Sequence, residues 1–220
     1  MKKLVLIHTV NWYERSVMIP YANPWQKNNP DVEIVSIMDD SLLSESLAHG
    51  GPTASVMRRM VYYFMAAENM NADVTMCTCT TMGPCTRVAR KIVKNQVMNI
   101  DEPMAREAVS RGKVMGVFAT FPTSAPATKT LLEIEAAEQG KSIEIKTVIN
   151  ETAARHLLNN EMDKHNEIVL GELDKLQHQV DVIVLGQISL SQVKFNGNVP
   201  VLQVGSSGFD YAGKLLGSLK

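Results

Sequence analysis

The chain has 220 residues, of which 45% are hydrophobic and 20% are charged, values that are ordinary for a globular enzyme. Its formal net charge of −1 at pH 7 provides no field that would attract nucleic acid or anionic lipid, so neither is expected as a partner. A small-molecule partner is expected instead. The length permits one domain or two smaller ones.

The first segment, MKKLVLIHTV, contains about six apolar residues in a row, fewer than the roughly 7 to 15 of a signal peptide. Elsewhere no run approaches the ~20 apolar residues that a membrane helix needs. We therefore expect a buried first strand and a soluble, cytoplasmic protein.

Short apolar runs rich in β-branched residues alternate along the chain with longer stretches of helical period. This alternation is typical of parallel strands joined by crossover helices, and it predicts an α/β fold. The predicted strands are residues 3–8, 32–37, 73–77, 97–100, 114–119, 142–148, 182–185 and 199–204.

Two helices have recognisable ends. One is predicted over residues 53–69, and another over residues 125–139, where Gly140 ends it. The segment of residues 12–25, which contains several aromatic residues, is predicted to form a loop that covers the site. The methionines of residues 57–65 are compatible with a homo-oligomer, since Met57, Met60 and Met65 lie near Tyr62 and Phe64.

An internal repeat suggests two similar lobes. The segments DVTMCTCTTMG and DVIVLGQISLS align without a gap, which sets Cys79 opposite Gln187. A second match sets Thr9 opposite Thr120, and a third sets Asp39 opposite Asp101.

The repeat predicts how the chain is divided. We expect an N-terminal α/β lobe over residues 1–98, completed by residues 205–220, and a C-terminal α/β lobe over residues 99–204. The lobes would be related by a pseudo-twofold axis. Because ligands of parallel sheets bind beyond the carboxyl ends of the strands, the site is predicted in the cleft between the lobes.

The three cysteines lie close together in the sequence, and their number is odd. A disulfide framework is not expected. No histidine or Cys-x-x-Cys pair lies near enough to complete a zinc site, so no metal is expected. Cys77 is predicted in a strand and Cys85 in the first turn of a helix, both as structural residues.

Cys79 is the most reactive candidate. It follows a predicted strand beside Thr80 and Thr81, ahead of a Gly-Pro pair that opens a helix. Free backbone N–H groups and a helix N-terminus favour an anion, and would lower a thiol pKa from about 8.5. The alternative is a small buried hydrophobic residue.

These residues carry a family resemblance. Cys79-Thr80-Thr81, followed by Gly83, resembles the first cysteine motif of the aspartate/glutamate/hydantoin racemase family. Residues 100–105, IDEPMA, resemble the segment that joins that family's two lobes. Further similar stretches at residues 7–9, 39–43 and 119–126 extend the resemblance over nearly the whole chain.

The resemblance implies proton transfer at a carbon next to a carboxylate, with no cofactor and no metal. In the family, one thiolate removes the proton from one face and a second thiol delivers a proton to the other. This sequence has Gln187 where the second cysteine is expected. Glutamine has no titratable group and cannot serve as an acid or base.

Three mechanisms remain open. In the first, Cys79 is the sole acid, base or nucleophile, and Gln187 and Ser189 hold a carboxylate. This mechanism would suit decarboxylation or isomerisation. Alternatively His165 replaces the missing thiol, unless it is an exposed helical histidine. In the third case the protein is a non-catalytic, carboxylate-binding regulator. A Cys-dependent hydrolase would need a histidine beside Cys79.

Hydroxyl side chains at strand ends are the candidate substrate ligands, with ordinary capping as the alternative. They are Thr9, Thr80, Thr81, Thr120, Ser124 and Ser189. Asp101 and Glu102 form a pair of carboxylates, for which we favour a helix N-cap at Asp101 over acid/base chemistry.

Overall fold

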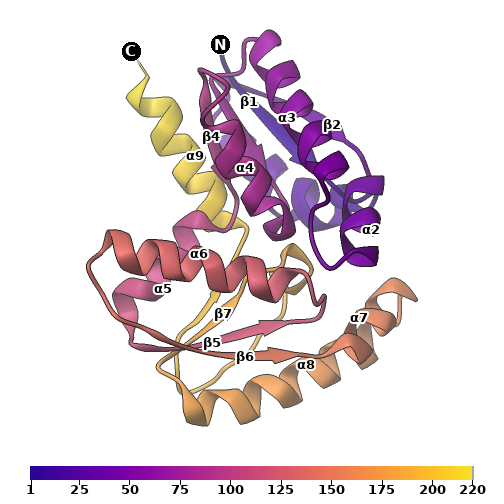
Figure 1. Ribbon diagram of the computed structural model, residues 1–220, viewed down its shortest axis with the longest axis vertical. Coiled ribbons are helices and arrows are strands. Elements are labelled where there is room, and N and C mark those ends of the chain that lie inside the picture. The colour runs from indigo at the N-terminus through magenta and orange to yellow at the C-terminus, as the bar shows by residue number, and fades with distance from the viewer. Residues whose placement is uncertain (220) are drawn as a thin grey trace. The chain divides into compact units, whose positions relative to one another are not determined.

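The computed structural model describes residues 1–219 and divides the chain into two compact units. The first comprises Met1–Glu102 together with the C-terminal segment from Gly205, and the second comprises Pro103–Val204. Each unit contains one four-stranded, entirely parallel sheet flanked by helices (Figure 1). The predicted α/β class with two similar lobes is thereby confirmed.

The sheet of the first unit has the strand order β2-β1-β3-β4. Its strands are β1 (Lys2–His8), β2 (Val32–Met38), β3 (Val74–Cys77) and β4 (Gln96–Asn99). The helices of this unit are η1 (Glu14–Ala22), α1 (Asn23–Asn28), α2 (Ser41–Ala48), α3 (Ala54–Asn69), η2 (Thr80–Met82), α4 (Gly83–Ala89) and α9 (Ser206–Ser218).

The sheet of the second unit has the corresponding order β6-β5-β7-β8. Its strands are β5 (Val114–Ala119), β6 (Glu144–Ile149), β7 (Val182–Leu185) and β8 (Val201–Gln203). Helix α5 (Glu102–Arg111) leads into it, and the remaining helices are α6 (Ser124–Glu138), α7 (Glu151–Leu158), α8 (Met162–Leu176), η3 (Gln177–Gln179) and η4 (Ile188–Leu190).

Strand alternation explains how helices cover both faces of each sheet, because successive side chains point to opposite faces. In the second unit Val117 packs with residues of α5 and α6, and its neighbour Phe118 packs with residues of α7 and α8. Figure 1 shows α6 and α8 on opposite sides of this sheet. In the first unit Ile7 packs with residues of α3 and α4, while α9 contacts β3 and β4.

All the predicted strands are present, and no end differs from its prediction by more than two residues. The two predicted helices are α3 and α6. Thr53 caps α3, since its hydroxyl accepts the Val56 N–H at 3.1 Å. Gly140 follows α6 with φ +64°, a conformation that favours glycine.

The prediction of a loop over residues 12–25 is wrong. A π-helix, η1, occupies most of this segment and contains Pro20. A proline normally breaks an α-helix, yet this segment is helical around Pro20. Burial of Val17 and Ala22 and stacking of Tyr13 on His8 hold the segment against the first unit.

The repeat holds at the level of hydrogen bonds. The Asp73 carboxylate accepts the Lys3 N–H at 2.7 Å as β1 begins, and the Asp181 carboxylate accepts the Val114 N–H at 2.8 Å as β5 begins. Each aspartate also precedes the third strand of its sheet, β3 or β7. The matches that pair Cys79 with Gln187 and Thr9 with Thr120 therefore have a structural basis.

The third match, of Asp39 with Asp101, is wrong. Asp39 follows β2 and donates its N–H to the His8 carbonyl at 3.1 Å. The corresponding strand in the second unit is β6, and the residue after it, Asn150, donates to the Ala119 carbonyl at 3.0 Å. Asp101 instead follows β4. The similarity of these two short segments therefore does not reflect equivalent positions in the two units.

Two further predictions concern surfaces. Met60 is fully buried in the core, so it is not an interface residue, whereas Tyr62 and Met65 are exposed on α3. Among residues 1–219, no helix combines the length and apolar character needed to cross a membrane.

Candidate functional site

Cys79 lies in the turn between β3 and η2, at the carboxyl end of a central strand. Its thiol is half-buried and has several hydrogen-bond donors around it. The hydroxyl of Thr9, which follows β1, is one, and the backbone N–H groups of Thr81 and Met82 are two more. The structure thus brings together three predicted site residues, Thr9, Cys79 and Thr81.

The prediction of a lowered thiol pKa is wrong. Burial raises the pKa of Cys79, and the hydrogen bonds from Thr9, Thr81 and Met82 offset that rise only in part. The donors favour the thiolate, but removal from water costs the charged form more. Cys79 therefore rests as a thiol whose conjugate base has donors already in place.

A buried polar network supports the Cys79 turn from behind. Asn99, the last residue of β4, donates to the Cys79 carbonyl at 3.3 Å and to the Asp101 carboxylate at 2.6 Å. The Thr80 side chain is hydrogen-bonded to the Asp101 carboxyl. Burial raises the pKa of Asp101 to about 6. The sequence did not single out Asn99 as a site residue. The available signal was an amide side chain in the strand predicted over residues 97–100.

Asp101 lies just ahead of α5, as expected of an N-cap. Its partners are Asn99 and Thr80. The neighbouring Glu102 accepts two hydrogen bonds from Arg90, at 2.5 and 2.6 Å. The two carboxylates thus have separate structural partners, which argues against a paired acid/base role.

Gln187 occupies the corresponding turn of the second unit, between β7 and η4. Its amide oxygen accepts the backbone N–H groups of Thr120 at 2.6 Å and Phe121 at 3.2 Å. Its amide nitrogen donates to the Thr120 hydroxyl at 3.0 Å and to the Ser189 hydroxyl at 3.3 Å. The structure brings Gln187, Thr120 and Ser189 together. The Gln187 amide makes its hydrogen bonds within the protein.

The remaining predicted site residues are Ser124 and His165. Ser124 begins α6, is buried, and donates its N–H to the Phe121 carbonyl at 3.1 Å. His165 lies on α8, and its Nδ1 pairs with the Ala153 carbonyl of α7 at 3.0 Å. It is completely buried, so the alternative of an exposed helical histidine is wrong. The residues around it in the sequence are polar, and they gave no sign that His165 faces inward.

His8, which with His165 is a histidine whose placement tests the Cys-dependent hydrolase, is buried. Its ring pairs with the hydroxyls of Thr78 at 3.0 Å and Ser36 at 3.2 Å and stacks on Tyr13. Burial lowers the pKa of His8 to about 3, so the ring is neutral. Both ring nitrogens are engaged, which removes His8 as the base that a Cys-dependent hydrolase requires.

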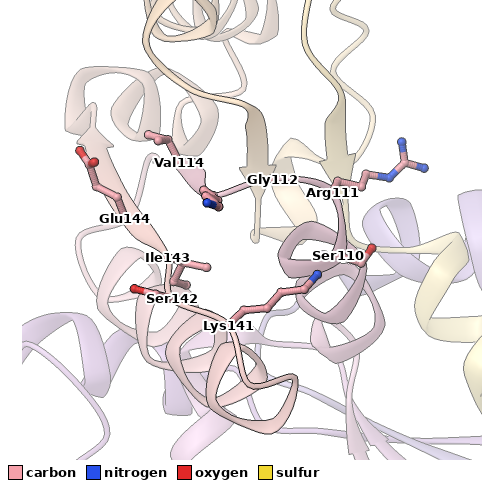
Figure 2. A pocket seen from close by; sticks show the side chains of 9 residues that line it. Ser110, Arg111, Gly112, Val114, Lys141, Ser142, Ile143 and Glu144 are labelled. Atoms are coloured by element: carbon pink, nitrogen blue, oxygen red, sulfur yellow. The ribbon is translucent and has the colours of Figure 1, made fainter.

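A separate hollow of about 720 Å³ lies where β5 and β6 begin (Figure 2). The Lys141 ammonium donates to the Val109 carbonyl at 2.9 Å, and Arg111 pairs with Glu107 while pointing away from the other lining side chains. None of the predicted site residues lines it. Ligands of parallel sheets bind at the opposite ends of the strands, so this hollow is not the candidate site.

No group of three or more histidine, cysteine, aspartate or glutamate side chains within residues 1–219 is placed to hold a metal ion. The predicted site residues that the structure brings to the strand ends supply a thiol, hydroxyls, an amide and backbone N–H groups. Together with two four-stranded parallel sheets, they define an α/β protein with a thiol at the carboxyl end of a central strand.

The comparison with protein families agrees with this class. The family model of Asp/Glu/Hydantoin racemase matches residues 26–202. The chain belongs to the Asp/Glu/hydantoin racemase family. No curated protein sequence matches it significantly.

Solved structures share the fold. Glutamate racemase RacE1 from Bacillus anthracis matches with a TM-score of 0.72 and 15% identity, covering 98% of this chain and 82% of that one. Aspartate racemase from Picrophilus torridus has a TM-score of 0.68 and 14% identity over 99% and 94%. Allantoin racemase from Klebsiella pneumoniae has a TM-score of 0.64 and 16% identity over 99% and 88%. At such low identity, these likenesses establish the fold alone.

Proposed function

We propose that this protein catalyses cofactor-independent proton transfer at the carbon next to the carboxylate of a small acid, with Cys79 as the transferring group. The observation that carries the proposal is the set of donors around the thiol, Thr9, Thr81 and Met82. They would hold a thiolate once the proton has left. Membership of a racemase family supports an isomerase.

The raised pKa of Cys79 favours the thiol as a proton donor in the resting enzyme. This observation supports decarboxylation as a second candidate reaction. The bond from the substrate carbon to one carboxylate breaks, carbon dioxide leaves, and the electron pair stays on that carbon. The carbanion then takes the Sγ proton, and solvent returns a proton to the thiolate.

Racemisation or isomerisation would begin from the thiolate instead. Sγ takes the proton from the substrate carbon, and the electron pair delocalises into the neighbouring carboxylate. Return of a proton to the other face needs an acid, which Gln187 is not. Two other functions are less well supported. Both ring nitrogens of His8 are engaged, which argues against a hydrolase that uses His8 as its base, and the donors around Cys79 argue against a regulator that does no chemistry.

The test is an NMR assay in deuterated water with aspartate, glutamate, a hydantoin and substituted malonates. Cys79→Ala and Cys79→Ser are compared with wild type, and Cys85→Ala is the matched control because Cys85 lies in α4. We expect deuterium incorporation or loss of carbon dioxide with one of these substrates, reduced at least about 100-fold by both Cys79 variants and retained by Cys85→Ala.

Equal activity of Cys79→Ala and wild type would contradict the assignment of Cys79. Saturable binding of a carboxylate without any turnover would favour the regulatory protein.

A further inference from the structure

Two backbone N–H groups at the carboxyl end of β5, those of Thr120 and Phe121, converge on one atom. That atom is Oε1 of Gln187, at 2.6 and 3.2 Å. Adjacent N–H groups that point to a common position form a concave site for an anion. Here a side-chain oxygen of the same chain occupies that position.

The rest of the glutamine amide is also engaged. A primary amide offers an oxygen with two acceptor positions and a nitrogen with two donor hydrogens. The oxygen accepts two N–H groups, and the nitrogen has two hydroxyl partners, Thr120 and Ser189. Gln187 is 5% exposed and Thr120 is fully buried. A substrate carboxylate could use these N–H groups only by displacing the amide.

The first unit uses the same position differently. Cys79 corresponds to Gln187 and Thr9 to Thr120, and in each unit the threonine hydroxyl is hydrogen-bonded to the residue of the turn. The thiol, however, receives the N–H groups of its own turn, from Thr81 and Met82. The longer glutamine side chain instead reaches the N–H groups after the neighbouring strand.

We propose that Gln187 closes an anion position in the second unit: its amide oxygen occupies the place where the backbone N–H groups of Thr120 and Phe121 would otherwise hold a carboxylate. The closure of this position follows from contacts within the second unit.

Acetate, the smallest convenient carboxylate probe, tests the closure without any turnover. Amide resonances of Thr120 and Phe121 are followed by NMR during acetate titration of wild type, Gln187→Ala and Gln187→Glu. We expect saturable shifts of both resonances in Gln187→Ala and none in wild type. Gln187→Glu keeps an acceptor oxygen in place and should also give none.

Hydrogen exchange of the Thr120 amide should be roughly tenfold faster or more in Gln187→Ala, because the variant lacks the acceptor. Saturable acetate shifts of both resonances in wild type would overturn the closure. So would an unresponsive, equally protected Gln187→Ala. If Gln187→Ala does not fold, the wild-type titration and rapid Thr120 exchange in Gln187→Glu remain able to refute it.

Discussion

The turns after β3 and β7 occupy the same place in two similar sheets, yet they present different chemistry. In one, Thr9 is hydrogen-bonded to a thiol that can give and take a proton. In the other, Thr120 is hydrogen-bonded to an amide that can do neither. Exchange of one side chain at this position thus replaces a titratable thiol by a neutral amide while the threonine contact persists.

The backbone support of the two turns is similar as well. Cys77 pairs in register with Asn99, and Leu185 pairs with Gln203. Asn99 donates to the Cys79 carbonyl at 3.3 Å, and Gln203 donates to the Leu190 carbonyl at 3.1 Å. An amide at the end of the last strand thus reaches the segment after the third strand in each unit, at the turn residue Cys79 in the first unit and at the end of η4 in the second.

The largest effect on stability is expected from Thr120→Val compared with Thr9→Val. Thr120→Val removes a buried acceptor of the Gln187 amide and should lower the free energy of unfolding by about 1–3 kcal/mol. Thr9→Val should cost less, because sulfur is a weak hydrogen-bond partner, but should raise the pKa of Cys79 further. Urea unfolding measures the first effect, and iodoacetamide alkylation across pH measures the second.

The order of these two stabilities is the decisive result. Equal losses would mean that the Gln187 amide contributes no more than the thiol contact, and faster alkylation of Thr9→Val would contradict the assignment of Thr9 as a thiolate donor.

Much of the fold could be predicted because its signals are local. Apolar runs identify strands such as Val114–Ala119, and Cys79 was placed at a strand end by the same pattern. The outcome of competition between effects could not be predicted. Burial outweighs the donors around Cys79, and residues far apart in sequence engage Gln187, neither of which a local pattern reports.

Asp101 gives a further contrast, as a buried carboxyl behind the reactive turn. Its pKa is about 6 in the folded protein against an ordinary 3.8, so folding favours its protonated form. Wild type should therefore lose stability relative to Asp101→Asn as pH rises from 4 to 7. We expect a relative change of about 1–3 kcal/mol, measured by urea unfolding at several pH values. A pH-independent difference would show that Asp101 ionises without cost.

Asp181 of the second unit should show the opposite slope with a smaller effect. The N–H groups of Val114 and Lys113 lower the pKa of this exposed carboxyl, so its ionised form stabilises the fold. Its contribution is present above the ordinary pKa of 3.8 and is lost as pH falls through the lowered value. Asp181→Asn should thus be less stable than wild type at pH 7 and approach it in acid, as followed by thermal unfolding. Asp73→Asn is the matched control, because Asp73 accepts the corresponding N–H in the first unit. A deficit that grows in acid would contradict this role for the Asp181 carboxylate.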